Sequence, residues 1–479
     1  MNNILKETDF KARYVIIGNS AAGISCAESI RSEDKNSEII ILTNEKYDNY
    51  SKPLISYFLA GKVDLKNIYF RNADFYESNK LILLKDFDVK KIDFQNREIL
   101  SRDNKKVVYE KLCIAAGGIP IVPDIEMMEI LKEESSETDY NKNNSSSDLY
   151  TGKVRNLTAE DLSNIEGIFT FTTLDDVLNI KNYTARNKIK ESVILGGGLI
   201  GLKSAESLLD LNLKMNIIEM SDRLLPASFD KEASEIYEKA FEELGSKVLT
   251  GETVKRIYTE ANKIKRVETG SGKTISSEML IIAAGVKPNI NFIDKGSKEF
   301  SSLIGYKGIK TDKYMKTLIP DVFAAGDIAE NENVLKKSIE NIAIWPLAVR
   351  QGRIAGKNMT GLAKEYYGGF AMNSVEIFGI PSVAVGITNP YDFDEKHMEI
   401  IKDYKKDTNT YKKIIIFDNL IIGALLIGNI ERAGIFSGLI ANKVNVEKIK
   451  DLLLRDDFGV IQLPSEYKKH LVTGEAIAI

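Results

Sequence analysis

Cysteine and histidine are scarce in this chain. Among its 479 residues there are two cysteines, Cys26 and Cys113, and two histidines, His397 and His470. The cysteines form no CxxC or CxxxxC pair, so no local redox dithiol is predicted, and in their apolar segments we expect them to pack in the core. Neither histidine has a metal-ligating neighbour at a suitable spacing. The sequence therefore predicts no zinc, haem or iron–sulfur site of its own.

Net charge and long apolar runs are also limited. The formal net charge is −4 at pH 7, so no broad basic surface invites nucleic acid. The first residues lack the apolar core of a signal peptide, and no run reaches the roughly 18 apolar residues of a membrane span. The longest apolar stretch, 414–428, is interrupted by Asp418-Asn419 and predicts a hairpin of two buried strands. We therefore expect a cytoplasmic protein without nucleic-acid or membrane partners.

A glycine-rich loop follows the first apolar strand. The strand 14–18 runs into Gly18-x-Ser20-x-x-Gly23, which opens a helix, and a second strand follows at 38–43. This order of strand, helix and strand is the unit that binds a dinucleotide when its loop carries the glycine pattern. The sequence thus predicts a first dinucleotide-binding unit at the start of the chain.

A second loop of the same kind lies in the middle of the chain. The strand 192–197 leads into Gly196-x-Gly198-x-x-Gly201, a helix follows, and the next strand is 214–220. The first glycine allows the tight turn, the second lets the backbone approach a pyrophosphate, and the third lets helix and strand pack closely. One such loop is a weak signal, but two in one chain indicate two dinucleotide-binding domains.

An acidic residue follows each loop after the second strand. Glu219 follows the second loop at close to the roughly 20-residue spacing expected for an acid that binds ribose hydroxyls. Glu45 follows the first loop at a somewhat longer spacing. In the first loop Ser20 replaces the middle glycine and Ala22 precedes the last one, so this match is weaker without excluding phosphate.

Three further strands end in small residues. The segments 112–118 and 280–286 both end in Ala-Ala-Gly, where Gly117 and Gly285 would let the chain turn sharply beside a ligand. The segment 321–330 ends its strand in Gly-Asp. These turns predict additional contacts with the two bound dinucleotides.

Two segments have contrasting compositions. The segment 126–160 is polar and rich in Asn and Ser, so we expect a disordered insertion in a surface loop, with a functional lid as the alternative. The segment 345–361 predicts a helix. Its small residues Ala348, Gly352 and Ala355 favour close packing against a flat partner or a neighbouring helix.

In their order, these motifs resemble one flavoprotein family. The stretches VIIGNSAAG, AAGG, GGGLIGLKSAE, AAGVKPN and DVFAAGD are similar to those of the FAD-dependent pyridine nucleotide–disulfide oxidoreductases. The resemblance implies an α/β fold with two Rossmann-like dinucleotide-binding domains and a smaller α+β C-terminal domain. It divides the chain into an FAD domain in two parts (1–125 and 286–370), the polar insertion (126–160), an NAD(H) domain (161–285) and a C-terminal interface or dimerisation domain (371–479). We expect the insertion to be dispensable for flavin binding.

The same resemblance implies which residues hold the two cofactors. Those expected to contact FAD are Gly18, Ser20, Ala22 and Gly23 at its pyrophosphate, Glu45 at its adenosine ribose, Val89 at its adenine, Gly117 beside it, and Asp327 at its ribityl chain and phosphates. Those expected to contact NAD(H) are Gly196, Gly198, Gly201, Glu219 and Gly285. The helix that begins near Trp345 is expected to point its positive end at the flavin.

Residues 45–62 resemble the branch of the family without a redox-active disulfide. This branch includes rubredoxin and ferredoxin reductases, the FAD part of nitrite reductases, and flavoprotein partners of carbon monoxide dehydrogenases. Its usual Tyr-x-Arg-Pro is represented here by Tyr50-Ser51-Lys52-Pro53. Lys52 keeps the charge of that arginine but loses its bidentate fork, and it is expected to contact FAD.

One pair of residues departs from the family pattern. Most members have a glutamate at the position of Lys203 and a lysine at the position of Tyr57, and the two form a pair beside flavin N5. The hypothesis is that Lys203 and Tyr57 form a catalytic pair in which the positive charge lies at position 203 instead of position 57. The Tyr57 hydroxyl would then lie within hydrogen-bond reach of the Lys203 ammonium. The alternative is that Lys203 extends along an exposed helix face into solvent.

The resemblance implies an FAD-dependent NADH oxidoreductase. Its expected partners are NADH and a small redox protein such as rubredoxin, ferredoxin or an iron–sulfur subunit, and a homodimer is a further expectation. Two alternatives stay open: an NADH oxidase that reduces O2 to peroxide, and a flavin-binding redox sensor without turnover.

Overall fold

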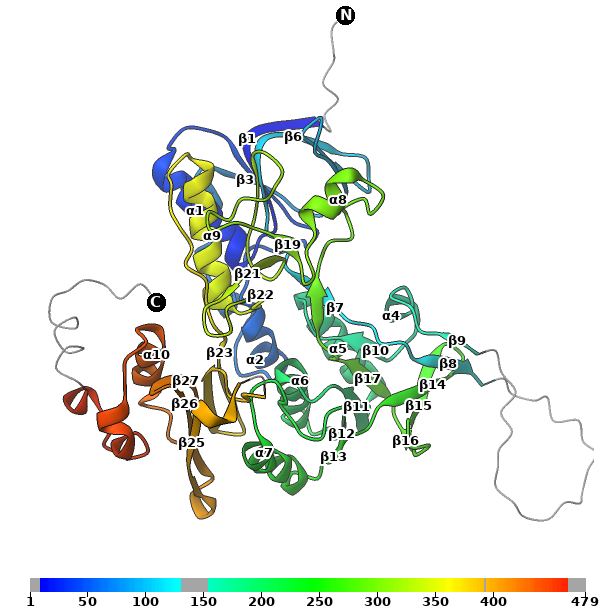
Figure 1. The fold of residues 1–479 in the computed structure, drawn as a ribbon. Helices are drawn as coiled ribbons and strands as arrows, with labels where there is room; N and C mark the ends of the chain where they lie inside the picture. The colour runs from blue at the N-terminus through cyan, green and yellow to red at the C-terminus, as the bar shows by residue number, and fades with distance from the viewer. Residues whose placement is uncertain (1–8, 131–153, 392, 464–479) are drawn as a thin grey trace, which may run out of the picture.

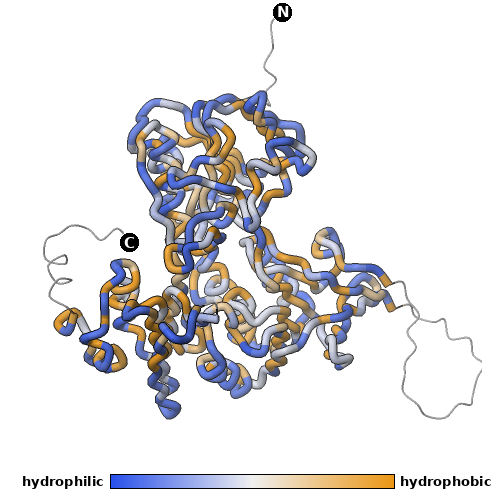
Figure 2. Tube along the Cα trace, viewed as in Figure 1, coloured by the Kyte–Doolittle hydropathy of each residue, from blue (hydrophilic) through white to orange (hydrophobic). Residues whose placement is uncertain are grey.

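The computed structural model describes residues 9–130, 154–391 and 393–463. Its sheets form three groups, with the N-terminal sheet at the top of Figure 1, a second parallel sheet at the lower right and an antiparallel C-terminal sheet at the lower left. Hydrophobic residues follow the central strands of these sheets, and hydrophilic residues dominate the surrounding loops (Figure 2). This arrangement confirms the predicted fold class.

The N-terminal sheet is built on a buried central strand. Strand β1 (Asp9–Ile17) pairs in parallel with β2 (Ile39–Leu42) and β6 (Lys106–Ile114), and α1 (Ala21–Glu33) connects β1 to β2. Its hydrophobic run has no polar face because the sheet is covered on both sides. The sheet also contains β3 (Leu81–Leu84), β4 (Val89–Asp93), β5 (Glu98–Ser101) and β20 (Val322–Ala324).

The second parallel sheet repeats this order of strand, helix and parallel strand. Its strands are, in spatial order, β10 (Ile168–Thr170), β17 (Met279–Ile282), β11 (Glu191–Leu195), β12 (Lys214–Glu219) and β13 (Lys247–Thr250). Its helices are α5 (Leu174–Asn187), α6 (Leu199–Leu209) and α7 (Lys231–Glu243). Both predicted strand–helix–strand units are therefore present, each with its glycine loop between strand and helix.

Shorter elements connect these two sheets. Strands β7 (Gly118–Pro120) and β18 (Val286–Pro288) pair with each other where the chain passes from one sheet to the other. The other short elements are α2 (Ile55–Leu59), α3 (Phe75–Ser78), α4 (Asp161–Asn164), α8 (Lys298–Leu303), β19 (Ile309–Lys310), β21 (Ala329–Asn333) and β22 (Ser338–Glu340).

The ends of the polar segment 126–160 are ordered, which corrects the expectation of disorder at these residues. Strand β8 (Glu126–Glu129) pairs with β9 (Val154–Asn156) and adds in parallel to β14 (Val254–Glu260), which continues to β15 (Lys263–Thr269) and β16 (Thr274–Ser276). Met127 on β8 is buried. The strand pairing satisfies backbone groups that the polar composition had suggested would stay in water. Residues 131–153 lie outside the described ranges.

The C-terminal sheet shares its hydrophobic core with the second parallel sheet. It contains β23 (Met372–Ile377), β24 (Ile380–Gly386), β27 (Leu420–Ile427), β26 (Thr410–Phe417) and β25 (Met398–Lys405), with α10 (Ala433–Ala441) against it. The pair β26–β27 confirms the predicted hairpin of buried strands. Ile377 and Leu425 of this sheet belong to the same cluster of buried side chains as Leu202 of α6 and Tyr237 of α7.

Helix α9 (Trp345–Met359) packs closely along α1, as its small residues predicted. A Cβ atom added to Gly352 would lie 2.1 Å from the carbonyl oxygen of Ala22, and one added to Gly356 would lie 2.4 Å from that of Cys26. The two helices run side by side at the upper left of Figure 1. Glycine at these two positions therefore sets how closely α9 approaches the first loop.

Replacing Gly352 with alanine should destabilise the protein. The new methyl would overlap the backbone of Ala22, and overpacking of this kind costs about 1–3 kcal/mol. The matched control is Gly434→Ala in α10, where nothing lies within 4 Å of the added Cβ. Thermal unfolding should show a lower Tm for Gly352→Ala and a change under about 1 kcal/mol for the control. Equal Tm values for the two variants would contradict this packing.

The ordered ends of the polar segment should matter more than its centre. Replacing 126–160 with a short Gly/Ser loop removes β8 and β9 and exposes the core that Met127 covers, which should lower the stability by about 1.5–3 kcal/mol. Replacing only 131–153 keeps both strands and should leave Tm and FAD content as in the original protein. A loss of FAD from the smaller replacement would contradict the prediction that the segment is dispensable for flavin binding.

Candidate functional site

The first glycines of the two loops have the same geometry. Gly18 and Gly196 both have a φ angle of +118°, and a Cβ atom there would lie 2.1 Å and 2.3 Å from the carbonyl oxygens of Ala115 and Ala283, respectively. Only glycine fits a positive φ and such close backbone contact. The Ala-Ala-Gly strand ends are therefore the surfaces against which both loops turn.

The third glycines are equally constrained. A Cβ atom at Gly23 would lie 1.9 Å from the carbonyl oxygen of Gly18, and one at Gly201 would lie 1.9 Å from that of Gly196. Each helix thus begins in direct contact with its own loop. This geometry is the one that the sequence pattern predicted for close packing of helix and strand.

The middle residues of the two glycine loops, Ser20 and Gly198, are the N-caps of the helices that follow. Nothing lies within 4 Å of a Cβ atom added to Gly198, which is the N-cap of α6. Ser20 is the N-cap of α1, and its side chain makes no capping hydrogen bond. The first-turn N–H groups of both helices are therefore not capped by a side chain, and a helix N-terminus of this kind attracts phosphate. Both loops fit a pyrophosphate.

Glu219 lies against the second loop at the end of β12. Its carboxylate accepts hydrogen bonds from the backbone N–H of Gly197, at 2.6 Å, and of Ser221, at 2.7 Å. The residue is only 8% exposed. A carboxylate has about four lone-pair directions, so Glu219 can still accept from ribose hydroxyls.

Arg223, the nearest cation in sequence to Glu219, is turned to other partners. Its guanidinium donates to the carbonyl of Phe229 at 2.9 Å and to the hydroxyl of Tyr391 at 3.1 Å, and it pairs with Asp222 at 2.5 Å. It is therefore not placed to neutralise a 2′-phosphate on a nucleotide bound at Glu219.

Glu45 and Lys52 are joined within one loop. The hydroxyl of Tyr50 donates to Glu45 at 2.5 Å, and the ammonium of Lys52 lies 3.3 Å from the other carboxylate oxygen. Burial raises the pKa of Tyr50 well above its usual range, so the phenol stays protonated. The N–H of Leu174, at the start of α5, donates to the same hydroxyl at 3.0 Å. These contacts hold the loop against the second parallel sheet, and a ribose contact by Glu45 stays a prediction.

Asp327 follows β20 at the end of the Gly-Asp turn. Burial raises the pKa of its carboxyl, and the nearby Lys52 opposes that rise. Within the described ranges its carboxylate accepts no hydrogen bond, whereas the N–H of Gly326 before it donates to Gln351 at 2.7 Å. A partly buried acceptor without donors fits a ligand that brings hydroxyl groups, as the ribityl chain of FAD does.

A hydrogen-bond network beside the first loop was not predicted. The hydroxyl of Tyr76 donates to the side-chain oxygen of Asn19 at 2.8 Å and accepts from the backbone and side-chain N–H groups of Asn49 at 3.1 and 2.9 Å. The side-chain oxygen of Asn49 is buried without a partner. The network fixes Asn19 inside the loop, and its orphaned oxygen is a second acceptor that a bound FAD could satisfy.

Three more predicted cofactor contacts are placed at strand boundaries. Val89 begins β4, Gly117 directly precedes β7 and Gly285 directly precedes β18. Both glycines have positive φ angles, +66° and +107°. The turns that they allow are thus observed, and their contacts with FAD or NAD(H) stay predictions.

Lys203 contacts Tyr57, but not through the hydroxyl. The ammonium lies 4.3 Å from the centroid of the Tyr57 ring, a cation–π contact, and it forms an ion pair with Glu206. The side chain of Lys203 is 15% exposed, so it does not extend into solvent. Lys203 and Tyr57 are thus in contact, with a geometry different from the expected hydrogen bond, and their catalytic role stays a prediction. Glu206, one helical turn onward, is a third member that the sequence did not indicate.

The cysteines are structural. Cys26 and Cys113 are both fully buried, and burial raises the pKa of the Cys26 thiol well above its usual value. Over the ranges described, no three His, Cys, Asp or Glu side chains gather as a metal site, and no helix is long and apolar enough to cross a bilayer. Redox chemistry by a thiolate of this chain is thus disfavoured.

Comparison with known proteins decides the family. Residues 12–352 match the family described as pyridine nucleotide-disulphide oxidoreductase, and residues 372–444 match the rubredoxin NAD+ reductase C-terminal domain. The chain belongs to the pyridine nucleotide-disulphide oxidoreductases. The first match spans both glycine loops and Asp327. The protein is an FAD-dependent NADH oxidoreductase, and the residues above form its candidate cofactor sites.

Relatives of similar length share this organisation. The NADH-dependent phenylglyoxylate dehydrogenase subunit epsilon of Aromatoleum evansii is 26% identical over 94% of this chain and 96% of that protein. An NADH oxidase of Methanocaldococcus jannaschii is 29% identical over 74% of this chain and 71% of its own. The crystal structure of NADH:rubredoxin oxidoreductase from Clostridium acetobutylicum has the same fold, with a TM-score of 0.66, 22% identity and coverage of 92% and 98% of the two chains.

The placement of Glu219 predicts a preference for NADH over NADPH. A 2′-phosphate would meet the buried carboxylate while Arg223 is held elsewhere, and like charges at close range cost several kcal/mol. We expect kcat/KM for NADPH to be lower by at least about tenfold. Glu219→Gln keeps a hydrogen-bond acceptor but removes the charge, so it should reduce the difference in kcat/KM between NADH and NADPH. Equal kcat/KM for the two coenzymes in the original protein would contradict the role of Glu219.

Proposed function

We propose that this protein takes electrons from NADH through FAD and passes them singly to a small redox protein of the rubredoxin, ferredoxin or iron–sulfur type. The burial of both cysteines carries this proposal. Because no thiol is placed to receive electrons from the flavin, they must leave the chain from the flavin itself. The described residues gather no metal site for a next carrier, which agrees with a separate protein in that role.

The C-terminal region and the relatives support a protein acceptor. Residues 372–444 match a domain that is described for rubredoxin NAD+ reductase, and the relative in Aromatoleum evansii is named as a subunit of an NADH-dependent dehydrogenase. The first description names rubredoxin, a small redox protein, and the second names one subunit of a larger NADH-dependent enzyme. The identity of the acceptor, a homodimer and the cytoplasmic location stay predictions.

The residues of this chain would bind and orient the two dinucleotides. FAD, when bound, supplies a ring that accepts two electrons from NADH and can release them one at a time. The loop at Gly18 and the N-terminus of α1 would hold its pyrophosphate, and Lys52 and Asp327 face the same region. The loop at Gly198 and Glu219 would hold NADH. Helix α9 begins without a side-chain cap, so its first N–H groups stay available to an electron-rich ligand.

An NADH oxidase is the second candidate, because the Methanocaldococcus jannaschii relative bears that name. With no accessible thiol beside the flavin, O2 would be reduced to peroxide rather than further. A redox sensor without turnover is the remaining alternative, and it differs from both because it would not turn over NADH.

Anaerobic reduction followed by reoxidation tests the proposal. NADH should bleach the flavin absorbance of the purified protein, and rubredoxin or ferredoxin should restore it faster than air does. Gly198→Asp is the matched control. It places a carboxylate in the free space where the NADH pyrophosphate would lie, so it should block bleaching by NADH while leaving FAD content and bleaching by dithionite unchanged. Fast restoration by air alone would favour the oxidase, and no bleaching by NADH would favour the sensor.

A further inference from the structure

Three parts of the chain meet at the ammonium group of Lys203. The lysine itself belongs to α6 of the second parallel sheet. Its ammonium lies over the ring of Tyr57 in α2, which belongs to the N-terminal region, and it donates at 3.0 Å to the carbonyl of Glu376 in β23 of the C-terminal sheet. It also pairs with Glu206 on its own helix. One charge therefore contacts three segments that are far apart in the sequence: α6, α2 and β23.

Glu206 completes the contact with β23. One of its carboxylate oxygens pairs with Lys203, and the other accepts at 2.9 Å from the backbone N–H of Phe378. Lys203 thus holds the carbonyl of residue 376 and Glu206 holds the amide of residue 378. The two side chains act as a donor and an acceptor for the edge of one strand, in the way that a neighbouring strand would.

Because the ion pair between Lys203 and Glu206 is largely buried, its loss should cost more stability than the loss of a surface pair. The side chains of Lys203 and Glu206 are 15% and 6% exposed. Removing one partner of such a pair leaves the other charge without compensation, which costs far more than losing a surface pair. Lys62 lies 3.9 Å from Glu206, but it is half exposed and turned mainly to Asp210, at 2.8 Å. It therefore cannot take the place of Lys203.

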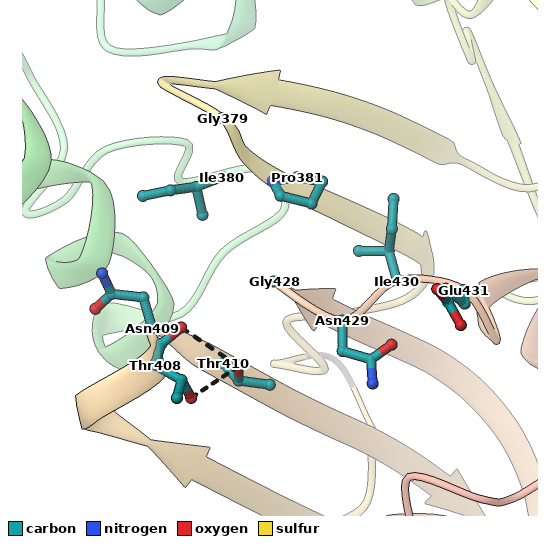
Figure 3. Close-up of a pocket in the computed structure, with 10 residues that line it drawn as sticks. All are labelled: Gly379, Ile380, Pro381, Thr408, Asn409, Thr410, Gly428, Asn429, Ile430 and Glu431. Carbon is teal, nitrogen blue, oxygen red and sulfur yellow. Dashed lines mark hydrogen bonds between the residues drawn. The ribbon is translucent and has the colours of Figure 1, made fainter.

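The turn that the pair holds joins β23 to β24, and α7 contacts it as well. Phe378 has a φ angle of +53°, and its ring packs edge-on against Phe241 of α7 with centroids 4.7 Å apart. The hydroxyl of Tyr237 donates to the carbonyl of Ile380 at 3.0 Å. Hollows of about 640 and 230 Å³ flank the turn, and Figure 3 shows the larger one, bordered by Gly379, Ile380 and Asn409. The β23–β24 pairing thus fixes the turn within its own sheet, and the contacts from α6 and α7 fix it against the second parallel sheet.

We propose that Lys203 and Glu206 are positioning residues that set the approach of the NADH loop to the flavin-binding segment. Helix α6 begins directly after Gly198, so whatever fixes its first two turns also fixes the loop that would bind NADH. Tyr57 lies in the segment that begins with Lys52, on the flavin side. The clamp on residues 376–378 ties both to the C-terminal sheet. This inference rests on the proposed function and adds a role for the contact between Lys203 and Tyr57.

Two variants and a matched control test the clamp. Lys203→Met keeps the length of the side chain but removes its charge, and Glu206→Gln keeps an acceptor for Phe378 while weakening the pair. The control is Lys181→Met. Lys181 in α5 also lies over a ring of α2, that of Phe58 at 4.7 Å, but it is exposed and holds no strand.

Amide exchange and stopped-flow reduction are measured on the FAD-loaded proteins. Without NADH, Lys203→Met should speed hydrogen exchange in residues 374–380 by at least about fivefold, because local opening becomes easier. With NADH, its limiting rate of flavin reduction should fall by about 10- to 100-fold, as expected from a misplacement near 1 Å, while the Kd for NADH changes less than threefold. Glu206→Gln should show the same pattern more weakly, and Lys181→Met should match the original protein in all three measurements.

A charge-swapped double variant separates the clamp from simple ion pairing. In Lys203→Glu/Glu206→Lys the pair persists, but a carboxylate then faces the carbonyl of Glu376 and an ammonium faces the amide of Phe378. It should not restore the reduction rate, and restoration would overturn the proposal. Unchanged exchange in Lys203→Met, or faster exchange with an unchanged reduction rate, would overturn it as well. If NADH failed to reduce even the original protein, the proposed function would fail, and the exchange data would still decide whether the clamp exists.

Discussion

The contact between each glycine loop and the end of a neighbouring strand is the constraint on which the candidate site depends. Gly18 lies against the carbonyl of Ala115, and Gly196 lies against that of Ala283. In each case the contact brings a helix N-terminus to the carboxyl edge of a parallel sheet, where dinucleotides bind in folds of this kind. A side chain at either glycine would separate helix from strand and widen the crevice. The placement of Glu219 follows from this contact, since its carboxylate is held by the loop itself.

The two binding regions are linked by contacts that are chemically unlike the glycine loops. Tyr50 joins Glu45 to the start of α5, and Lys203 joins α6 to Tyr57 and to β23. Both links use a polar or charged side chain that is shielded from water by its neighbours. Such links are directional, so they define how two domains face each other more sharply than hydrophobic contact alone would. The chain therefore fixes each cofactor loop locally and the relation between the loops by a few specific bonds.

The features that depend on a local residue pattern could be predicted from the sequence. Both strand–loop–helix units, the β26–β27 hairpin and the small face of α9 follow from residue spacing, because backbone geometry there admits only certain side chains. Contacts between residues far apart in the chain could not be predicted from the sequence. Tyr76 reaches Asn19, and Glu206 reaches Phe378, with no periodic signal to indicate either contact. The polar composition of 126–160 concealed β8 and β9 because backbone pairing and the burial of Met127 order those residues without a regular hydrophobic alternation.

The core shared by the second parallel sheet and the C-terminal sheet limits how this protein can be recombined. Ile377, Tyr411 and Leu425 pack into one buried cluster with Leu202 and Tyr237, so the boundary near residue 371 is not a boundary of packing. Exchange of the C-terminal domain with that of a relative would replace one side of this cluster and disturb its packing. A chimera that keeps the native fit would have to carry α6 and α7 together with the transferred sheet. The structural unit that packs together in this part of the molecule is therefore larger than the C-terminal domain that the sequence suggests.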